Sequence, residues 1–179
     1  MPSPQLFIFA GLPGVGKTTL ARRLARELHA VYLRIDSIDQ AMRDEHLAID
    51  GPAGYVVAYR LAEDNLRLGT PVVADSVNPI RITRRAWREV AVRAGVPFAE
   101  IEVICSDAAE HRRRVESRPG DIAGLHLPTW DEVQTRERDA WETSPIIIDT
   151  AGQTEIDSFA SLRRALIRCS GRGRPGCPG

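Results

Sequence analysis

A glycine-rich run between an apolar segment and an amphipathic segment constrains the fold of this chain more than any other feature. Residues 11–18 read Gly-Leu-Pro-Gly-Val-Gly-Lys-Thr and follow the pattern G-x-x-x-x-G-K-[ST]. The apolar residues 6–10 precede this run, and Leu20, Leu24 and Leu28 recur every four residues after it. We therefore expect a buried strand, a glycine-rich turn and an amphipathic helix in this order.

The same run predicts a site for the phosphate groups of ATP. Glycines let consecutive backbone N–H groups surround phosphate oxygens, and the start of the following helix adds partial positive charge. Lys17 is expected to bridge the β and γ phosphates, and Thr18 to offer its hydroxyl to Mg²⁺. The predicted ATP-binding residues are Gly11, Leu12, Pro13, Gly14, Val15, Gly16, Lys17, Thr18 and Thr19.

The remaining apolar segments predict an α/β fold. Further strands are expected at residues 31–35, 72–75, 101–105 and 146–149, and further helices at residues 54–68, 80–94, 108–116 and 156–167. Strands that alternate with helices imply right-handed crossovers and a parallel sheet covered on both faces. The prediction is a three-layer α/β/α architecture with a five-stranded parallel sheet. In the helix at 54–68, Val57, Leu61 and Leu68 are the apolar residues at helical spacing.

Length and charge indicate one domain with no obvious macromolecular partner. The 179 residues suffice for one such domain, and 24 basic residues balance 24 acidic ones, which does not favour nucleic acid. No apolar run approaches the roughly 20 residues of a membrane span, and the N-terminus lacks signal-peptide features, so a cytoplasmic location is expected. A monomer or homodimer is also expected. The domain is expected over residues 1–169, followed by a disordered Gly/Pro-rich tail at 170–179.

Two acidic residues stand at the carboxyl ends of predicted strands. Asp36 follows the second strand and Asp75 ends the third. Ligands of open α/β sheets bind at this edge, so Asp36 could accept the proton of an acceptor hydroxyl, and Asp75 could hold Mg²⁺ directly or through water. The alternatives are that Asp36 caps a helix starting near Ser37 and that Asp75 caps the turn at residues 76–79.

A basic cluster lies in and after the predicted helix at 108–116. It contains Arg112, Arg113, Arg114 and Arg118 and is followed by a segment with glycine and proline. Arg114 and Arg118 are four residues apart and share one helical face. We expect residues 117–128 to form a lid that excludes water and brings both arginines to the γ phosphate, with a solvated basic face as the alternative.

These motifs resemble the P-loop small-molecule kinases of the nucleoside-monophosphate-kinase fold (AAA_33-like) over residues 6–150. Residues 34–42 are similar to the acceptor segment of chloramphenicol phosphotransferases, in which an aspartate followed by serine is the catalytic base. Arg114 and Arg118 before Gly120-Asp121 resemble the lid of the same family. Residues 75–79, followed by Arg84 or Arg85, resemble the kinase domain of polynucleotide kinases, and residues 127–134 are weakly similar to gluconate kinases.

The resemblance implies transfer of the γ-phosphoryl group of ATP to a hydroxyl of a small-molecule acceptor. The implied catalytic residues are Asp36, Lys17, Arg114 and Arg118, and the expected acceptor residues are Asp36, Ser37, Tyr59, Arg60 and Asn78. Tyr59 and Arg60 could equally be core and surface residues. Open alternatives are a polynucleotide or RNA 5′-hydroxyl kinase, a regulatory ATPase without an acceptor, and a zeta-type kinase of a sugar nucleotide.

Overall fold

A five-stranded parallel sheet forms the centre of the protein. The computed structural model describes residues 6–47 and 51–170, so the tail predicted at 170–179 lies outside these residues except for Ser170. The strands are β1 (Leu6–Ala10), β2 (Val31–Arg34), β3 (Val72–Asp75), β4 (Phe98–Ile104) and β5 (Ile146–Asp149), in the order β2-β3-β1-β4-β5. The predicted parallel sheet of five strands is confirmed.

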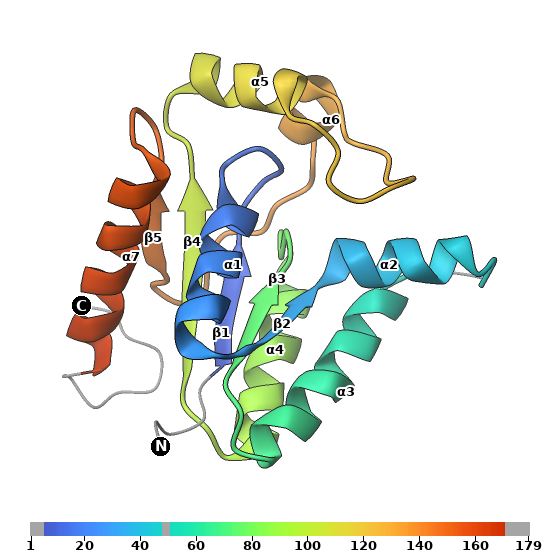
Figure 1. Ribbon diagram of the computed structural model, residues 1–179, viewed down its shortest axis with the longest axis vertical. Helices are drawn as coiled ribbons and strands as arrows, with labels where there is room; N and C mark the ends of the chain where they lie inside the picture. The colour runs from blue at the N-terminus through green and yellow to red at the C-terminus, as the bar shows by residue number, and fades with distance from the viewer. Residues whose placement is uncertain (1–5, 48–50, 171–179) are drawn as a thin grey trace.

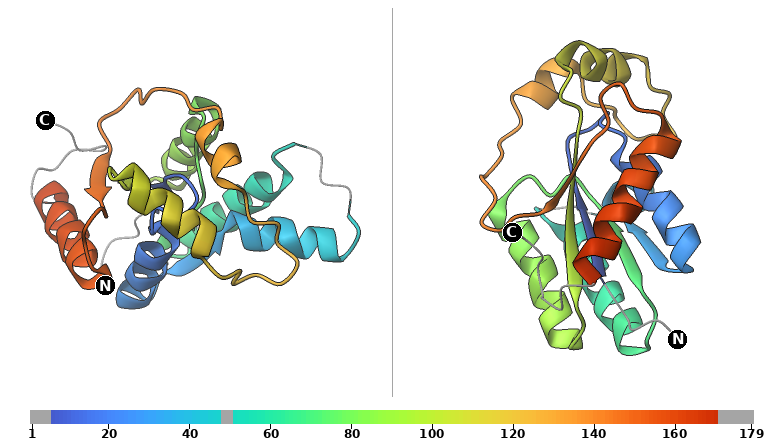
Figure 2. Two further views of the ribbon diagram at one scale, coloured as in Figure 1. Left: turned by 90° about the horizontal axis from the view of Figure 1, so that it is seen from above. Right: turned by 90° about the vertical axis from the view of Figure 1, so that its left-hand side faces the viewer.

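Helices cover both faces of the sheet and its carboxyl edge (Figures 1 and 2). They are α1 (Lys17–Leu28), α2 (Ile35–Asp44), α3 (Ala53–Arg67), α4 (Arg81–Ala94), α5 (Ala108–Ser117), α6 (Trp130–Gln134) and α7 (Glu155–Ser170). Helices α1 and α7 pack on one face, and α3 and α4 on the other. The three-layer prediction is therefore confirmed, while α2, α5 and α6 lie around the edge where the strands end.

The central strand β1 is buried on both sides because its residues alternate between two cores. Phe7 and Phe9 pack with residues of α1 and α7, whereas Leu6 and Ile8 pack with residues of α3 and α4, among them Trp87. Every residue of β1 is buried. The turn that follows β1 is consequently held at the middle of the carboxyl edge.

Several predicted element boundaries were wrong by a few residues; α6 was not predicted, and α2 only through the alternative role of Asp36. Strand β2 ends at Arg34 rather than residue 35, because α2 begins at Ile35. Strand β4 begins at Phe98 rather than at residue 101. The short α6 begins at a capping box, in which Thr129 and Glu132 each accept a hydrogen bond from the other's backbone N–H. A helix of five residues is too short to show apolar periodicity.

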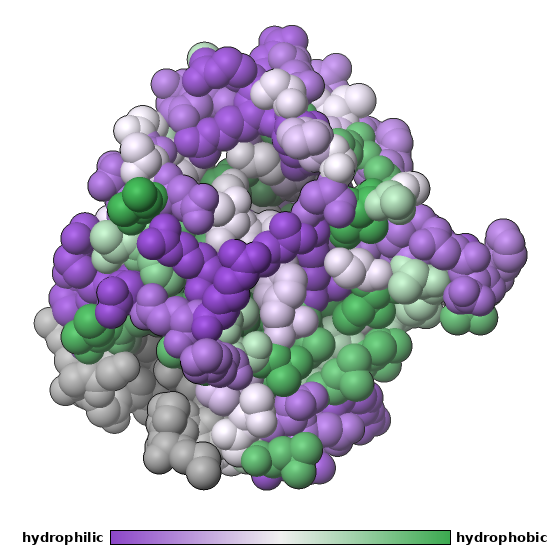
Figure 3. Space-filling model, in the orientation of Figure 1, coloured by the Kyte–Doolittle hydropathy of each residue, from purple (hydrophilic) through white to green (hydrophobic). Residues whose placement is uncertain are grey.

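The predicted apolar face of α3 was wrong. Val57, Leu61 and Leu68 are 39%, 43% and 81% exposed, and Figure 3 shows apolar surface over this helix. The buried residues of α3 are Gly54, Ala58, Ala62, Glu63 and Leu66. Most of these side chains are small, which lets α3 pack against α4 and the sheet at close range, so the larger apolar residues face outward.

Candidate active site

The turn between β1 and α1 requires glycine for two separate reasons. Gly11, Gly14 and Gly16 have φ angles of 146°, 86° and 89°. A Cβ atom at Gly11 would lie 2.4 Å from the carbonyl oxygen of Val103, and one at Gly14 would lie 2.6 Å from a methyl carbon of Val115. Gly11 and Gly14 are therefore required both by backbone conformation and by the lack of space.

The start of α1 is a site for an anion. Gly16 is the N-cap and offers no side-chain hydrogen bond, and no acidic residue lies in the first turn. The first backbone N–H groups of a helix lack intrahelical acceptors and carry partial positive charge. Together with Lys17, Thr18 and Thr19 they face a cavity of about 1100 Å³. These groups fit the phosphates of a nucleotide.

Asp75 lies beneath this turn, paired with the predicted phosphate-binding lysine. It is 1% exposed, and its two oxygens accept hydrogen bonds from Lys17 Nζ at 2.5 Å and from the Tyr32 hydroxyl at 2.6 Å. Burial favours a higher pKa, but Lys17 and the hydroxyls of Tyr32 and Thr18 hold the pKa of Asp75 below its usual value. Asp75 is therefore an ionised carboxylate next to Thr18. The alternative prediction was that Asp75 caps the turn at residues 76–79.

Thr18 and Asp75 together suit Mg²⁺. Both offer oxygen atoms, which this ion prefers, and Mg²⁺ in kinases takes most of its ligands from water and substrate phosphates. In residues 6–47 and 51–170, no cluster of three or more His, Cys, Asp or Glu side chains could hold a metal ion. The residues thus fit a Mg²⁺ ion bound mainly by ATP rather than a metal held by the protein alone.

Asp36 faces the same cavity as the phosphate loop. It lies in the first turn of α2, and its carboxylate is 3.8 Å from Nε of Arg34. The N-cap of α2 is Arg34, so the alternative in which Asp36 caps a helix near Ser37 is wrong. The Asp36 side chain is 42% exposed and lines the cavity together with Lys17 and Thr18.

Residues 118–128 connect α5 to α6 and cover the cavity, which appears as a hollow bordered by hydrophilic side chains (Figure 3). Arg118 lines the cavity, and burial lowers its pKa against the opposing charges of Asp36 and Asp121. Its Nε atom is buried without a hydrogen-bond partner in the described part of the chain. Arg118 is therefore a cation available to a ligand. Whether residues 117–128 move as a lid stays a prediction.

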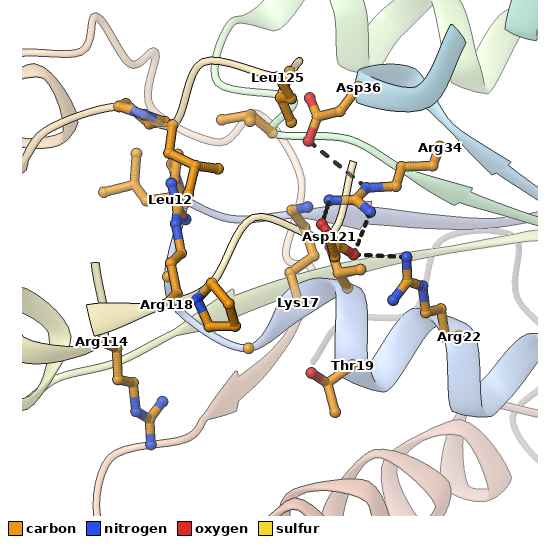
Figure 4. Close-up of a pocket in the computed structure, with 18 of the residues that line it drawn as sticks. Leu12, Lys17, Thr19, Arg22, Arg34, Asp36, Arg114, Arg118, Asp121 and Leu125 are labelled. Carbon is orange, nitrogen blue, oxygen red and sulfur yellow. Dashed lines mark hydrogen bonds and ion pairs between the residues drawn. The ribbon is translucent and has the colours of Figure 1, made fainter. Parts of the chain in front are cut away.

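Arg114 also lines the cavity, but its guanidinium is already hydrogen-bonded to neighbouring protein groups (Figure 4). Its guanidinium donates hydrogen bonds to the hydroxyl and carbonyl of Thr150, at 2.8 and 3.0 Å, and to Glu110 at 2.5 Å. The expected common face with Arg118 does not form, because α5 ends at Ser117 and Arg118 has extended backbone angles. Both arginines thus line the cavity, Arg114 from α5 and Arg118 from the extended segment after it.

Most of the expected acceptor residues do not line this cavity. Of the five, the structure places only Asp36 in the lining. Ser37 and Arg60 are exposed on α2 and α3. Tyr59 packs edge-to-face on Trp87, with ring centroids 4.7 Å apart, and belongs to the core around α4.

Asn78 has a structural position on the other side of the phosphate loop. It is 1% exposed and its amide donates to the carbonyl oxygen of Phe9 at 3.1 Å. The neighbouring Arg84 donates to the carbonyl oxygens of Pro79, at 3.0 Å, and Ala140, at 2.8 Å. Arg84 therefore joins the segment after β3 to the segment before β5.

A group of charged residues that the sequence did not bring together converges on the cavity. Asp121 accepts hydrogen bonds from Arg34 at 2.7 and 3.0 Å and from Arg22 at 2.7 Å (Figure 4). The hydrogen bonds from Arg34 and the charges of both arginines hold the pKa of Asp121 at about 2. The sequence held one signal for this group, since Arg34 stands two residues before Asp36 at the same strand end.

Comparison with known proteins identifies the family of this chain. Residues 6–136 match the family described as AAA domain (AAA_33). The chain belongs to this family. A protein of Aeropyrum pernix named "Probable adenylyl-sulfate kinase" is 27% identical to this AAA domain over 169 residues, which cover 88% of the chain and 91% of the relative.

Solved structures agree with the fold of this AAA domain. A gluconokinase from Sinorhizobium meliloti superposes with a TM-score of 0.64 at 17% identity, covering 97% of this chain and all of that one. The Mycobacterium tuberculosis APS kinase, in complex with AMPPNP and APS, has a TM-score of 0.63 at 18% identity and covers 93% and 99%. The predicted P-loop kinase fold is thus confirmed. In the described ranges, no helix is long and apolar enough to cross a membrane.

Proposed function

We propose that this P-loop kinase transfers the γ-phosphoryl group of ATP to a hydroxyl group of a small-molecule acceptor bound beside Asp36. The observation that carries the proposal is that Asp36, Lys17 and Thr18 share one cavity of about 1100 Å³. Pockets for single small ligands have volumes of roughly 300–1,000 Å³, so this cavity has room for a nucleotide and a compact acceptor. The named relatives support the class of reaction, since their names describe kinases of small molecules.

The residues of the cavity divide the chemistry among them. The backbone N–H groups of the phosphate loop and Lys17 bind the phosphates and neutralise their charge. Asp36 accepts the proton of the acceptor hydroxyl while the oxygen of that hydroxyl forms a bond to the γ phosphorus. The bond from this phosphorus to the β-phosphate oxygen breaks, and ADP leaves. Mg²⁺, held by Thr18 and Asp75, would offset negative charge on the phosphates when bound. Arg118 adds a positive charge from the covering segment.

Replacement of Asp36 tests the proposal. Asp36→Asn keeps the size of the side chain and the phosphate loop, so MgATP affinity is expected to stay within about twofold. A general base contributes roughly 10²–10⁴-fold, so transfer should fall at least 100-fold. Lys17→Ala should weaken both binding and transfer, because the lysine contacts the phosphates.

The measurement is ADP release with a metabolite library as acceptors, combined with calorimetric titration of an ATP analogue. Asp64→Asn is the matched control, since Asp64 is exposed on α3 and outside the cavity lining. Full transfer by Asp36→Asn would exclude Asp36 as the base. A cytoplasmic location and a monomeric or homodimeric state stay predictions from the sequence.

A further inference from the structure

The carboxylate of Asp121 occupies a cradle made of two arginines from different parts of the chain. Arg34 at the end of β2 donates through Nη1 at 2.7 Å and Nη2 at 3.0 Å, and Arg22 of α1 donates through Nη2 at 2.7 Å. Two parallel hydrogen bonds from one guanidinium are the geometry that binds carboxylate, sulfate or phosphate groups most specifically. The three donors therefore form an anion site that is already assembled.

Burial makes this site depend on an anion. The Arg34 side chain is only 9% exposed, and a buried guanidinium is costly unless it is paired and hydrogen-bonded. Asp75 and Asp36 also face Arg34, but Asp75 is paired with Lys17 and Asp36 lies 3.8 Å from Nε without a hydrogen bond. The Nη atoms thus need a carboxylate or an equivalent group from elsewhere.

The present occupant comes from the segment that covers the cavity. Asp121 belongs to residues 118–128, which contain no helix or strand, and its side chain is 40% exposed. Residues of this cover line the same cavity as Lys17 and Asp36, so a nucleotide and an acceptor bound there would lie against it. When the cover moves, the cradle loses Asp121 and is open to an anion in the cavity.

We propose that the acceptor of this kinase carries an anionic group, a carboxylate, sulfate or phosphate, that binds Arg34 and Arg22 in place of Asp121. The proposal rests on the proposed function and names the chemistry of the acceptor at that site. Arg34 precedes Asp36 by two residues. An acceptor whose anionic group binds in the cradle therefore has its hydroxyl held near Asp36, the proposed base. Asp121 is then an internal competitor that occupies the cradle until the acceptor arrives.

Inorganic sulfate is a suitable probe, titrated calorimetrically at constant ionic strength with saturating Mg-AMPPNP, which fills the phosphate loop. Asp121→Asn is expected to bind sulfate at least fivefold more tightly than the wild type, because the competing charge is gone. The double variant Asp121→Asn/Arg34→Gln should lose this gain. Glu116→Gln, which removes an exposed acid on α5, is the matched control and should leave sulfate affinity unchanged.

Equal sulfate affinity in the wild type and Asp121→Asn, or a gain that survives Arg34→Gln, overturns the proposal. A gain that is seen with Mg-ADP but disappears with Mg-AMPPNP also overturns it, because the cradle then serves the γ phosphate. These titrations involve no turnover. Failure of the proposed function, seen as full activity in Asp36→Asn, is therefore distinguishable from failure of the anion site.

Hydrogen exchange of the unmodified protein gives an independent measurement. If sulfate displaces Asp121, the backbone amides of residues 120–125 should exchange at least threefold faster when sulfate is added to the Mg-AMPPNP complex. Amides of α7 serve as an internal reference and should not change. Exchange in residues 120–125 that is unaffected at saturating sulfate contradicts the proposal even if a variant misfolds.

Discussion

The buried pair of Asp75 and Lys17 predicts a specific loss of stability in Asp75→Asn. The side chains of Asp75 and Lys17 are 0% and 8% exposed, and the substitution leaves the Lys17 ammonium buried without its counter-ion. Breaking such a pair by removing one charge costs about 3–5 kcal/mol. The amide oxygen can still accept from Tyr32, so we expect a value near the lower end, about 3 kcal/mol.

This free energy converts to a measurable change in melting temperature. For a chain of this size, 1 kcal/mol shifts Tm by roughly 2–4 °C, so Asp75→Asn should melt about 6–12 °C below the wild type. Circular dichroism without nucleotide and Mg²⁺ measures the shift. ADP added with a chelator should recover more of the Tm in the variant than in the wild type, because the phosphates supply the missing anion to Lys17.

Asp64→Asn, at an exposed position of α3, is the control and should change stability by no more than about 0.5 kcal/mol. A Tm of Asp75→Asn within 2 °C of this control would refute the reasoning. So would an equal stabilisation of wild type and variant by ADP, since it would mean that the phosphates do not take over the pairing with Lys17.

Two further predictions follow from the phosphate loop and the covering segment. Gly14→Ala places a Cβ 2.6 Å from Val115 in a residue whose φ is 86°. Tm should therefore fall, and the affinity for ATP measured by calorimetry should fall at least tenfold. Unchanged affinity would contradict the steric argument. The folded pKa of Asp121, about 2, lies below its unfolded value of about 3.9, so its ion pairs stabilise the fold above pH 4 and are lost as pH falls towards 2. The difference in free energy of unfolding between the wild type and Asp121→Asn, measured with urea, should therefore shrink as the pH falls from 4 to 2. It should be no more than about 1 kcal/mol at the start, because the Asp121 side chain is 40% exposed. A difference that grows over this range would contradict the prediction.

The sequence predicted the parts of the molecule that depend on local pattern and strand position. Short apolar runs and a glycine-rich turn predict β1, the phosphate loop and α1 without knowledge of the packing. Asp36 and Asp75 could be placed at one edge because the carboxyl ends of parallel strands meet there. The confirmed architecture follows from the alternation of strands and helices.

Packing decided the parts that the sequence did not predict. The buried face of α3 consists of Gly54, Ala58, Ala62, Glu63 and Leu66, whereas Val57, Leu61 and Leu68 face outward, a choice that apolar spacing alone does not make. Arg114 and Arg118 do not share a helical face because α5 ends at Ser117, an end that Pro119 and Gly120 signal in the sequence. The cradle of Arg22, Arg34 and Asp121 joins residues up to 99 positions apart, and such pairing leaves no periodic signal.

The buried guanidinium of Arg84 limits where the chain can be lengthened. The Arg84 guanidinium joins Pro79 to Ala140 and so fixes the chain just after the covering segment and α6. A hydrogen bond from His111 to the carbonyl oxygen of Pro13 fixes the chain just before the covering segment. Both ends of the stretch from α5 to residue 140 are thus tied to the sheet edge. Residues inserted between these two ties would lengthen the covering segment, and so change the lining of the cavity, while both ties stay in place.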